Sequence, residues 1–290
     1  MTESADAERA YYFQDLSHRT IEQAARACTA AAGADGAGEA AGNLCGMDLE
    51  RCDLDLIALV AAGSCEGLSP WREAQARELA FWRWVAVHGY GGNHPLLFPL
   101  FQEHLMVSTF YRTGWAMGEF RGAAVVEIGC GPLGMIEYVA ARRRVAFDPL
   151  NDRYGRLFAN FRSADVEYLV DRDRFRQDPT LFELGICHNV IDHTDDPAGW
   201  FNTLFAKIAP GGRFIFQVNL SKAETPQVPA HRRMHPSPIT FEQVSAWLGA
   251  KSDAFDHFCE TQANRDGEYY FLAWGRKTSD EPVSYRKLID

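Results

Sequence analysis

Residues 125–134 constrain the fold of this chain more than any other segment. They read Val-Val-Glu-Ile-Gly-Cys-Gly-Pro-Leu-Gly, an apolar run that is followed by Gly129, Gly131 and Gly134. A short apolar run bounded by glycine is typical of a buried strand. Glycines let the next stretch of backbone turn sharply, approach a ligand and pack a helix against the sheet. The segment therefore predicts a buried strand, a nucleotide-cofactor loop and a helical segment, in that order.

The acidic residues around this loop indicate which cofactor it holds. The glycine spacing alone is that of a dinucleotide-binding loop. Glu127, however, lies two residues before the first glycine, where a carboxylate repels a pyrophosphate and suits the cationic methionine group of S-adenosylmethionine. Asp148 ends the next predicted strand, residues 144–147, at the right distance to accept hydrogen bonds from both ribose hydroxyls of an adenosine. Asp148 suits either cofactor, so Glu127 decides against NAD.

Further strands are predicted at residues 184–190 and 213–218. The first runs into Ile-Asp-His-Thr-Asp-Asp-Pro at 191–197, and the second follows Ile-Ala-Pro-Gly-Gly at 208–212. Strands that alternate with helical segments in this way indicate a parallel sheet with helices on both faces.

Four short motifs carry a resemblance to a known family. They are E-I-G-C-G-P-L-G at 127–134, F-D-P-L-N-D-R-Y at 147–154, H-N-V-I-D-H-T-D-D-P at 188–197 and P-G-G at 210–212. In these motifs, over about residues 120–275, the chain resembles the class I S-adenosylmethionine-dependent methyltransferases. The resemblance implies an enzyme with a doubly wound, mostly parallel seven-stranded α/β sheet, and S-adenosylmethionine as its cofactor.

The resemblance also implies roles for individual residues. Glu127 and the glycine loop hold the methionine end, and Asp148 holds the ribose. The chain reads Val-Asp-Arg-Asp-Arg at 170–174, where the family often has an acidic residue followed by a small one. Either Asp171 or Asp173 therefore contacts the adenine amino group. The expected cofactor-binding set is Glu127, Gly129, Cys130, Gly131, Gly134, Asp148, Pro149, Asp171, Asp173, His188, Asn189 and Val190.

Three histidines are candidates for catalysis. His188 lies near the carboxyl end of a predicted strand, where open α/β sheets bind ligands. His193 lies in the loop that comes next, and His235 lies in the connection after the fifth strand. If the methyl acceptor is a hydroxyl, a histidine is the natural base at neutral pH. If the acceptor is an amine or a thioether, no base is required and the histidines orient the acceptor, so both readings stay open.

Metal ligands and disulfides are not expected. His231 and His235 could share a metal on a helix, but Pro229 and Pro236 flank them and no third ligand is obvious. The seven cysteines occur singly, without a C-x-x-C pair, which argues against a zinc ribbon and a redox pair.

The first 118 residues are predicted to form a helical cap, with a flexible Ala/Gly-rich loop near residues 30–42, and residues 119–290 to form the cofactor-binding domain. A cap over a methyl-transfer site excludes water and supplies groups that bind the acceptor. The expected substrate-binding residues are Trp82, His104, Tyr111 and Arg112 in the cap and Asn219 after the fifth strand.

Composition limits the choice of partners. The formal net charge is -10, which argues against nucleic acid, because a surface that follows a phosphate backbone needs clustered Lys and Arg. No signal peptide is recognisable, and no apolar run approaches the roughly 18 residues of a membrane helix. We therefore expect a cytoplasmic enzyme with a small-molecule acceptor and no membrane partner, and a homodimer is left open.

Two other classes of function compete with this prediction. An NAD-dependent oxidoreductase would be stabilised against heat by NADH and not by S-adenosylmethionine. A non-catalytic cofactor-binding protein would bind S-adenosylmethionine tightly and form no S-adenosylhomocysteine with any acceptor.

Overall fold

The structure is a computed structural model, and it describes residues 70–88, 97–221, 235–262 and 268–286. The part of the predicted cap before residue 70, with the Ala/Gly-rich loop at 30–42, lies outside the described residues. The chain divides into two compact units, Met1–Leu100 and Phe101–Asp290. Among the described helices, none is long and apolar enough to cross a membrane.

Two helices come before the sheet in the sequence. α4 spans Pro70–His88, as a proline at the first helical position predicts. α5 spans Leu97–Thr113. It ends because Gly114 takes a left-handed φ of +68°, the conformation that commonly terminates a helix. A short 3-10 helix, η2 (Met117–Phe120), then leads into the first strand.

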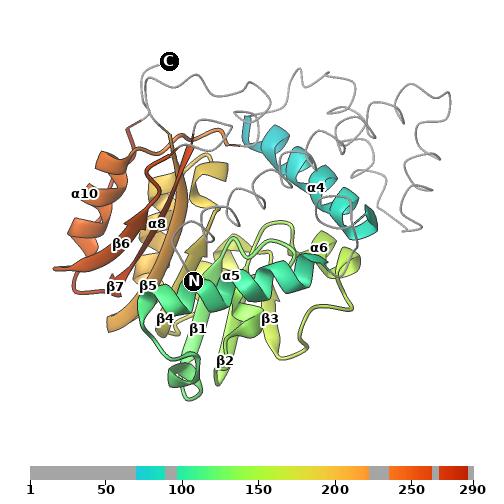
Figure 1. Cartoon of the computed structure of the whole chain (residues 1–290), viewed down its shortest axis with the longest axis horizontal. Coiled ribbons are helices and arrows are strands. Elements are labelled where there is room, and N and C mark those ends of the chain that lie inside the picture. The colour runs from blue at the N-terminus through green and yellow to red at the C-terminus, as the bar shows by residue number, and fades with distance from the viewer. Residues whose placement is uncertain (1–69, 89–96, 222–234, 263–267, 287–290) are drawn as a thin grey trace. The chain divides into compact units, whose positions relative to one another are not determined.

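The second unit contains the predicted seven-stranded sheet (Figure 1). Its strand order is β3-β2-β1-β4-β5-β7-β6, and all pairs are parallel except those of β7 with β5 and β6. The order reverses between β1 and β4, and in open α/β sheets a ligand binds at this switch point, outside the carboxyl ends of the strands. The strands are β1 Ala124–Ile128, β2 Arg143–Phe147, β3 Val166–Leu169, β4 Phe182–His188, β5 Ile208–Ser221, β6 Phe255–Cys259 and β7 Glu268–Arg276.

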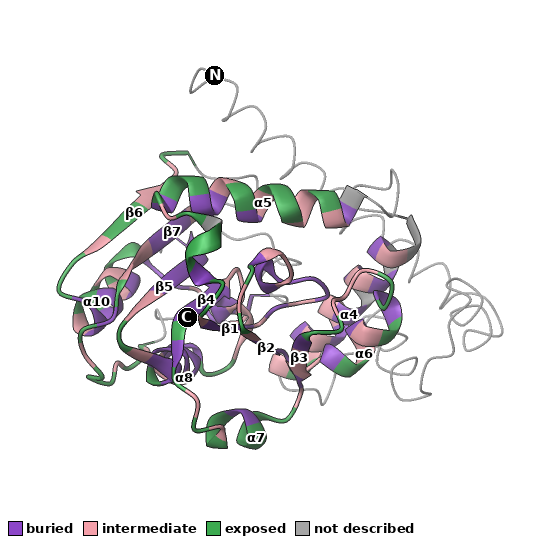
Figure 2. Cartoon of the chain, turned by 90° about the horizontal axis from the view of Figure 1, so that it is seen from below, coloured by how far each residue is buried: buried purple, intermediate pink, exposed green. Residues whose placement is uncertain are grey.

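Helices of the second unit connect these strands. They are α6 Asn151–Leu157, α7 Arg172–Gln177, α8 Pro197–Lys207 and α10 Phe241–Lys251, with the 3-10 helices η3 Met135–Tyr138 and η4 Ile191–His193. The strands are mostly buried, whereas the helices have exposed outer sides (Figure 2). The helical segment expected after the glycine turn is the 3-10 helix η3, which ends after four residues, where Val139 returns to an extended conformation (φ -87°, ψ 116°).

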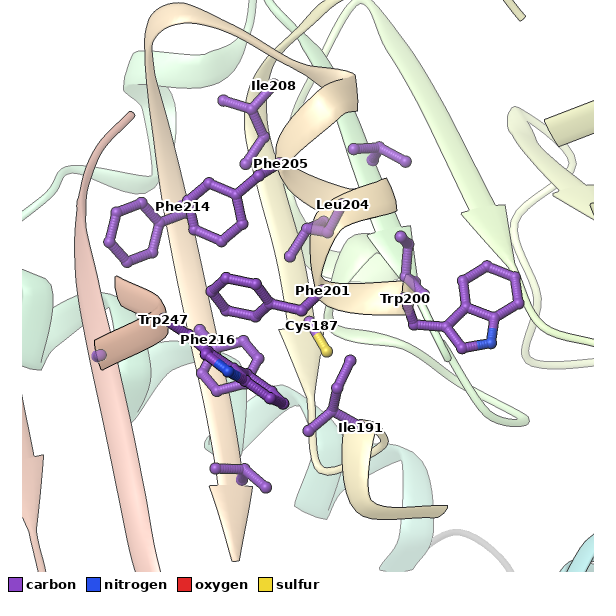
Figure 3. Close-up of a cluster of buried hydrophobic side chains, with 14 of the residues drawn as sticks. Cys187, Ile191, Trp200, Phe201, Leu204, Phe205, Ile208, Phe214, Phe216 and Trp247 are labelled. Carbon is purple, nitrogen blue, oxygen red and sulfur yellow. The ribbon is translucent and has the colours of Figure 1, made fainter. Parts of the chain in front are cut away.

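An aromatic cluster covers one face of the sheet between α8 and α10 (Figure 3). The ring of Phe201 on α8 packs edge-on against Phe216 of β5 at 5.2 Å and lies 5.2 Å from the Trp247 ring of α10. All three side chains are buried. This packing fixes the start of α8, and with it the η4 turn that comes just before α8.

Candidate functional site

The turn after β1 is built on two glycines in the left-handed region. Gly129 has a φ of +68° and Gly131 a φ of +58°. A Cβ atom on Gly129 would lie 2.1 Å from Cγ2 of Val190, so packing alone requires glycine there. A Cβ atom on Gly131 would meet no atom of the described residues within 4 Å. Gly131 therefore faces open space at the carboxyl edge of the sheet, where a ligand can approach its backbone.

Glu127 is buried beneath this turn. Its carboxylate accepts hydrogen bonds from the backbone amides of Met135 at 3.2 Å and Ile136 at 2.8 Å. A Cβ atom on Gly134 would lie 2.3 Å from Oε2 of Glu127, which explains the third glycine. Burial raises the pKa of Glu127 to about 7, although the two amide hydrogen bonds act in the opposite direction. Glu127 thus holds η3 in place, a role that the sequence analysis missed.

Asp148 joins the glycine turn to the end of β2. One carboxylate oxygen accepts a hydrogen bond from the Gly131 amide at 3.1 Å, and the other accepts one from the Leu150 amide at 2.8 Å. Pro149, between them, is half-buried. The contact of Asp148 with the two ribose hydroxyls stays a prediction. The structure thus brings Asp148 and Gly131 together, as the cofactor prediction requires.

Asn151 and Arg162 brace the same turn, and the sequence analysis missed both. The Asn151 side-chain amide donates to the backbone carbonyls of Ala146 and Leu169, and its Oδ1 accepts from Arg162 at 2.8 Å. Arg162 also donates to the Gly131 carbonyl at 2.9 Å. Asn151 could have been found from its place in the D-P-L-N motif, but Arg162 carries no motif of its own.

Cys130, between the two glycines, is buried. Its thiol donates to Oδ1 of Asn151 at 3.3 Å. Burial raises the pKa of Cys130 well above its usual value. Cys130 therefore stays a neutral thiol that packs the turn, rather than a nucleophile.

The two candidates for the adenine contact lie at the start of α7, and both are exposed. Asp171 caps the helix, because its carboxylate accepts hydrogen bonds from the amides of Asp173 at 2.8 Å and Arg174 at 2.9 Å. Both acids line an open cavity of about 500 Å³, together with Arg143 and Glu167, which pair with each other. Helix capping accounts for Asp171 and leaves the choice between the two acids open.

The carboxyl end of β4 carries His188, Asn189 and Val190. Burial lowers the pKa of His188 to about 4, so its imidazole is neutral at neutral pH. Asn189 has a φ of +53°, a conformation that asparagine tolerates better than most residues, and its amide donates to the Gln217 carbonyl at 3.1 Å. Val190 packs against Gly129. These contacts tie the end of β4 to β5 on one side and to the glycine turn on the other.

An imidazole–carboxylate pair lies just beyond β4. Nδ1 of His235 lies 2.6 Å from Oδ2 of Asp192, and both side chains are buried. Burial alone would raise the pKa of Asp192, but the charges of His235 and His193 and the hydrogen bond from His235 outweigh it and lower the pKa. An ionised carboxylate only accepts, so Nδ1 of His235 donates and its Nε2 has no proton in the neutral ring.

Ser237 holds this pair together. Its amide donates to the Asp192 carbonyl at 3.1 Å, and its hydroxyl donates to the Thr194 carbonyl at 2.6 Å.

The ring centroid of His193 lies 4.0 Å from the ring centroid of His235. The structure therefore brings together two of the three predicted histidines. The structure also adds Asp192 to the site, which the sequence analysis missed. An acidic residue directly beside the candidate His193 could have pointed to it.

The same three side chains offer a set of metal ligands. One ligand atom each from Asp192, His193 and His235 lie within 4.8 Å of one another. Two imidazoles and a carboxylate suit zinc or iron. In the structure, however, Asp192 and His235 already bond to each other through Oδ2 and Nδ1, as in a hydrogen-bonded catalytic pair.

The predicted substrate-binding residues are placed less favourably. On α5, Tyr111 is 87% exposed, His104 is exposed, and Arg112 lies over the Phe258 ring of β6 at 4.1 Å. Within the first unit, Trp82 donates to Glu78 at 2.6 Å. The substrate-binding role of these four residues stays a prediction. Asn219, on β5, lies near the carboxyl edge of the sheet.

Comparisons with known proteins point to one family. A family model described as a methyltransferase domain matches residues 107–262. The N-methyltransferase NodS from Bradyrhizobium japonicum WM9, solved with S-adenosyl-L-homocysteine, is 18% identical, with 72% of this chain and 98% of NodS covered and a TM-score of 0.49. A putative methyltransferase from Bacillus halodurans C-125 is 13% identical, with 60% and 99% covered and a TM-score of 0.44.

A third similar structure comes from Haemonchus contortus. It is phosphoethanolamine N-methyltransferase 2, 12% identical, with 61% of this chain and 53% of that chain covered and a TM-score of 0.46. The curated proteins contain no match to this chain. The family model, in contrast, spans more than half of the 290 residues. The chain therefore belongs to the methyltransferase domain family and is a class I methyltransferase whose cofactor is S-adenosylmethionine.

Proposed function

We propose that this methyltransferase transfers the methyl group to a hydroxyl oxygen of a small molecule, and that His235 takes the hydroxyl proton. The observation that carries the proposal is the hydrogen bond of 2.6 Å between His235 and the buried Asp192. An amine or thioether acceptor needs no base, so it gives no reason to bury an ionised carboxylate behind an imidazole. A hydroxyl acceptor does need one.

The contact between Asp192 and His235 suits His235 to accept one proton. Asp192 fixes the tautomer of His235, so that Nε2 carries the lone pair that can take a proton. When Nε2 takes the proton, the imidazolium forms beside a carboxylate whose pKa is lowered, and the charge pair stabilises it. The same arrangement of a carboxylate behind a histidine base recurs in hydrolases on unrelated folds.

The remaining requirement for methyl transfer is that the acceptor and the cofactor are positioned correctly. Bound S-adenosylmethionine supplies an electrophilic methyl group. In this proposal, Gly131 and Asp148 bind the methionine and ribose ends of the cofactor, and the neutral His188 adds a polar group without charge. Transfer needs the acceptor oxygen in line with the departing sulfur at near-attack distance. The net charge of -10 supports a small acceptor over a polyanion. The cytoplasmic location and the homodimer remain predictions.

The test is to identify the methylated atom. Purified protein is incubated with S-adenosylmethionine and a panel of alcohols, amines and thiols, S-adenosylhomocysteine formation is measured, and the product is assigned by NMR. We expect O-methylation. We also expect His235→Gln to lower kcat by about 10² to 10⁴ with unchanged S-adenosylhomocysteine affinity. His257→Gln is the control, since His257 is exposed on β6. Methylation at nitrogen or sulfur, or normal kcat in His235→Gln, contradicts the proposal.

A further inference from the structure

Three buried hydrogen-bond acceptors at the ends of β4 and β5 have no partner within the part of the chain that the structure describes. They are Nε2 of His188, Oδ1 of Asn189 and Oε1 of Gln217. We call these three residues the polar row. His188 and Gln217 are direct neighbours across the parallel strand pair, and Asn189 bonds to the Gln217 backbone. The three unpaired atoms therefore belong to adjoining residues at one edge of the sheet.

Such atoms are rare in folded proteins, because burying a polar group without a hydrogen bond destabilises the fold. Gln217 is 1% exposed, so bulk water does not reach it. A buried amide at the start of α6 shows the contrast. Asn151 is also buried, and its side chain is bonded at both its nitrogen and its oxygen. The fold thus supplies hydrogen-bond partners to the side chain of Asn151, whereas the three acceptor atoms of the polar row have none among the described residues.

The missing partner must donate hydrogen bonds. The Gln217 side-chain nitrogen is engaged with Oδ1 of Asn219 at 3.2 Å, which leaves the oxygen of Gln217 as the free atom. The imidazole of His188 is neutral and bonds to its own backbone, so its free Nε2 is an acceptor. The row carries no charge of its own. Neutral hydroxyl groups match all three acceptors without adding a buried charge.

The surroundings of the row fit a ligand site. Tyr270 of β7 is the neighbour of Asn219 across the strands, and its ring centroid lies 6.5 Å from that of His188. Burial raises the pKa of Tyr270 above its usual range, so it stays a neutral phenol. An apolar wall with a few convergent polar groups is typical of small-molecule sites.

We propose that the polar row binds hydroxyl groups of the methyl acceptor other than the one that is methylated, so that the acceptor is a polyol. This inference rests on the proposed function, because it assigns the row to the acceptor of that reaction. It names Gln217 as a specificity-determining residue, which no motif in the sequence marks.

The experiment replaces Gln217 by methionine, which keeps the length and removes the unpaired oxygen. Three quantities are measured for Gln217→Met and wild type: the apo melting temperature, the Kd of S-adenosylhomocysteine and the KM of a polyol acceptor from the screen. The matched control is Asn151→Leu, which removes a fully bonded buried amide and should lower the melting temperature. We expect Gln217→Met to leave the melting temperature and Kd near wild type and to raise KM about tenfold.

A deoxy analogue of the same acceptor tests the donor. Wild type should prefer the polyol over its deoxy analogue, and Gln217→Met should lose that preference. A melting temperature as low as that of Asn151→Leu would make Gln217 structural. A Kd weakened tenfold would assign the row to the cofactor. Equal use of monohydroxyl alcohols and polyols by wild type would also overturn the inference. Failure of the proposed function shows separately, as a product methylated at nitrogen or sulfur.

Discussion

The two halves of the carboxyl edge differ in how their buried polar groups are satisfied. On the β1–β2 side, Glu127, Asp148 and Asn151 each bond to the protein through both polar atoms of the side chain. On the β4–β5 side, Gln217 and Asp192 each keep one buried oxygen without a partner among the described residues. We therefore expect the fold to preorganise the proposed cofactor half, and a ligand to complete the proposed acceptor half.

The largest effect is expected from a substitution that prevents cofactor binding. Gly131→Val should abolish binding of S-adenosylhomocysteine in a folded protein, because its side chain would enter the space that we expect the cofactor to fill. Binding is measured by calorimetry and folding by circular dichroism. Gly114→Val is the matched control, since Gly114 has a similar φ of +68° and also has no described atom within 4 Å of a Cβ. Normal affinity in Gly131→Val would remove this turn from the site.

The next largest effect is expected from a substitution that lowers kcat and leaves cofactor binding unchanged. Asp192→Asn removes the ionised partner of His235, so kcat should fall by about 10² to 10⁴ while cofactor affinity stays normal. Single-turnover kinetics with saturating cofactor measure the loss. If cofactor affinity falls together with kcat, Asp192 belongs to the cofactor half and the comparison fails.

Asp148→Ala should weaken the cofactor by about tenfold to several hundredfold, since each charge-assisted hydrogen bond contributes roughly 1.5 to 3 kcal/mol. The apo melting temperature should fall too, because the carboxylate also holds the amides of Gly131 and Leu150. Calorimetry and thermal unfolding separate these effects. A lower melting temperature with normal affinity would leave Asp148 purely structural.

A smaller effect concerns pH. The folded-state pKa of Glu127, about 7, lies above its ordinary value of 4.5, so the folded apo protein binds this proton more tightly than the unfolded chain. Its contribution to the free energy of unfolding therefore falls as pH rises from about 4.5 to about 7. Urea unfolding across this range should show the slope in wild type and not in Glu127→Gln. Equal slopes would mean that Glu127 is ionised throughout.

The smallest effect expected is that of a chelator. Removing metal ions with EDTA should leave turnover unchanged, since Asp192 and His235 bond to each other in the structure. Loss of turnover that Zn²⁺ restores would instead assign Asp192, His193 and His235 to a metal centre.

The sequence predicted the sheet well because strands leave strong local signals. Apolar runs and glycines located β1, β2 and β4 to within about two residues. The helical segment predicted after the glycines is only the short η3, whose first amides bond to Glu127 across the turn. Arg162, Gln217 and the partner of His235 were missed for one reason. Their roles depend on contacts between segments far apart in the chain, such as the 43 residues between Asp192 and His235.

Within the polar row, we expect position 189 to tolerate fewer substitutions than position 217. The φ of +53° at Asn189 restricts the position to glycine and the few side chains that tolerate a left-handed backbone. Gln217 lies in regular β5, where many side chains are compatible with the backbone. Drift in acceptor preference among descendants of this enzyme should therefore accumulate at position 217 and spare position 189.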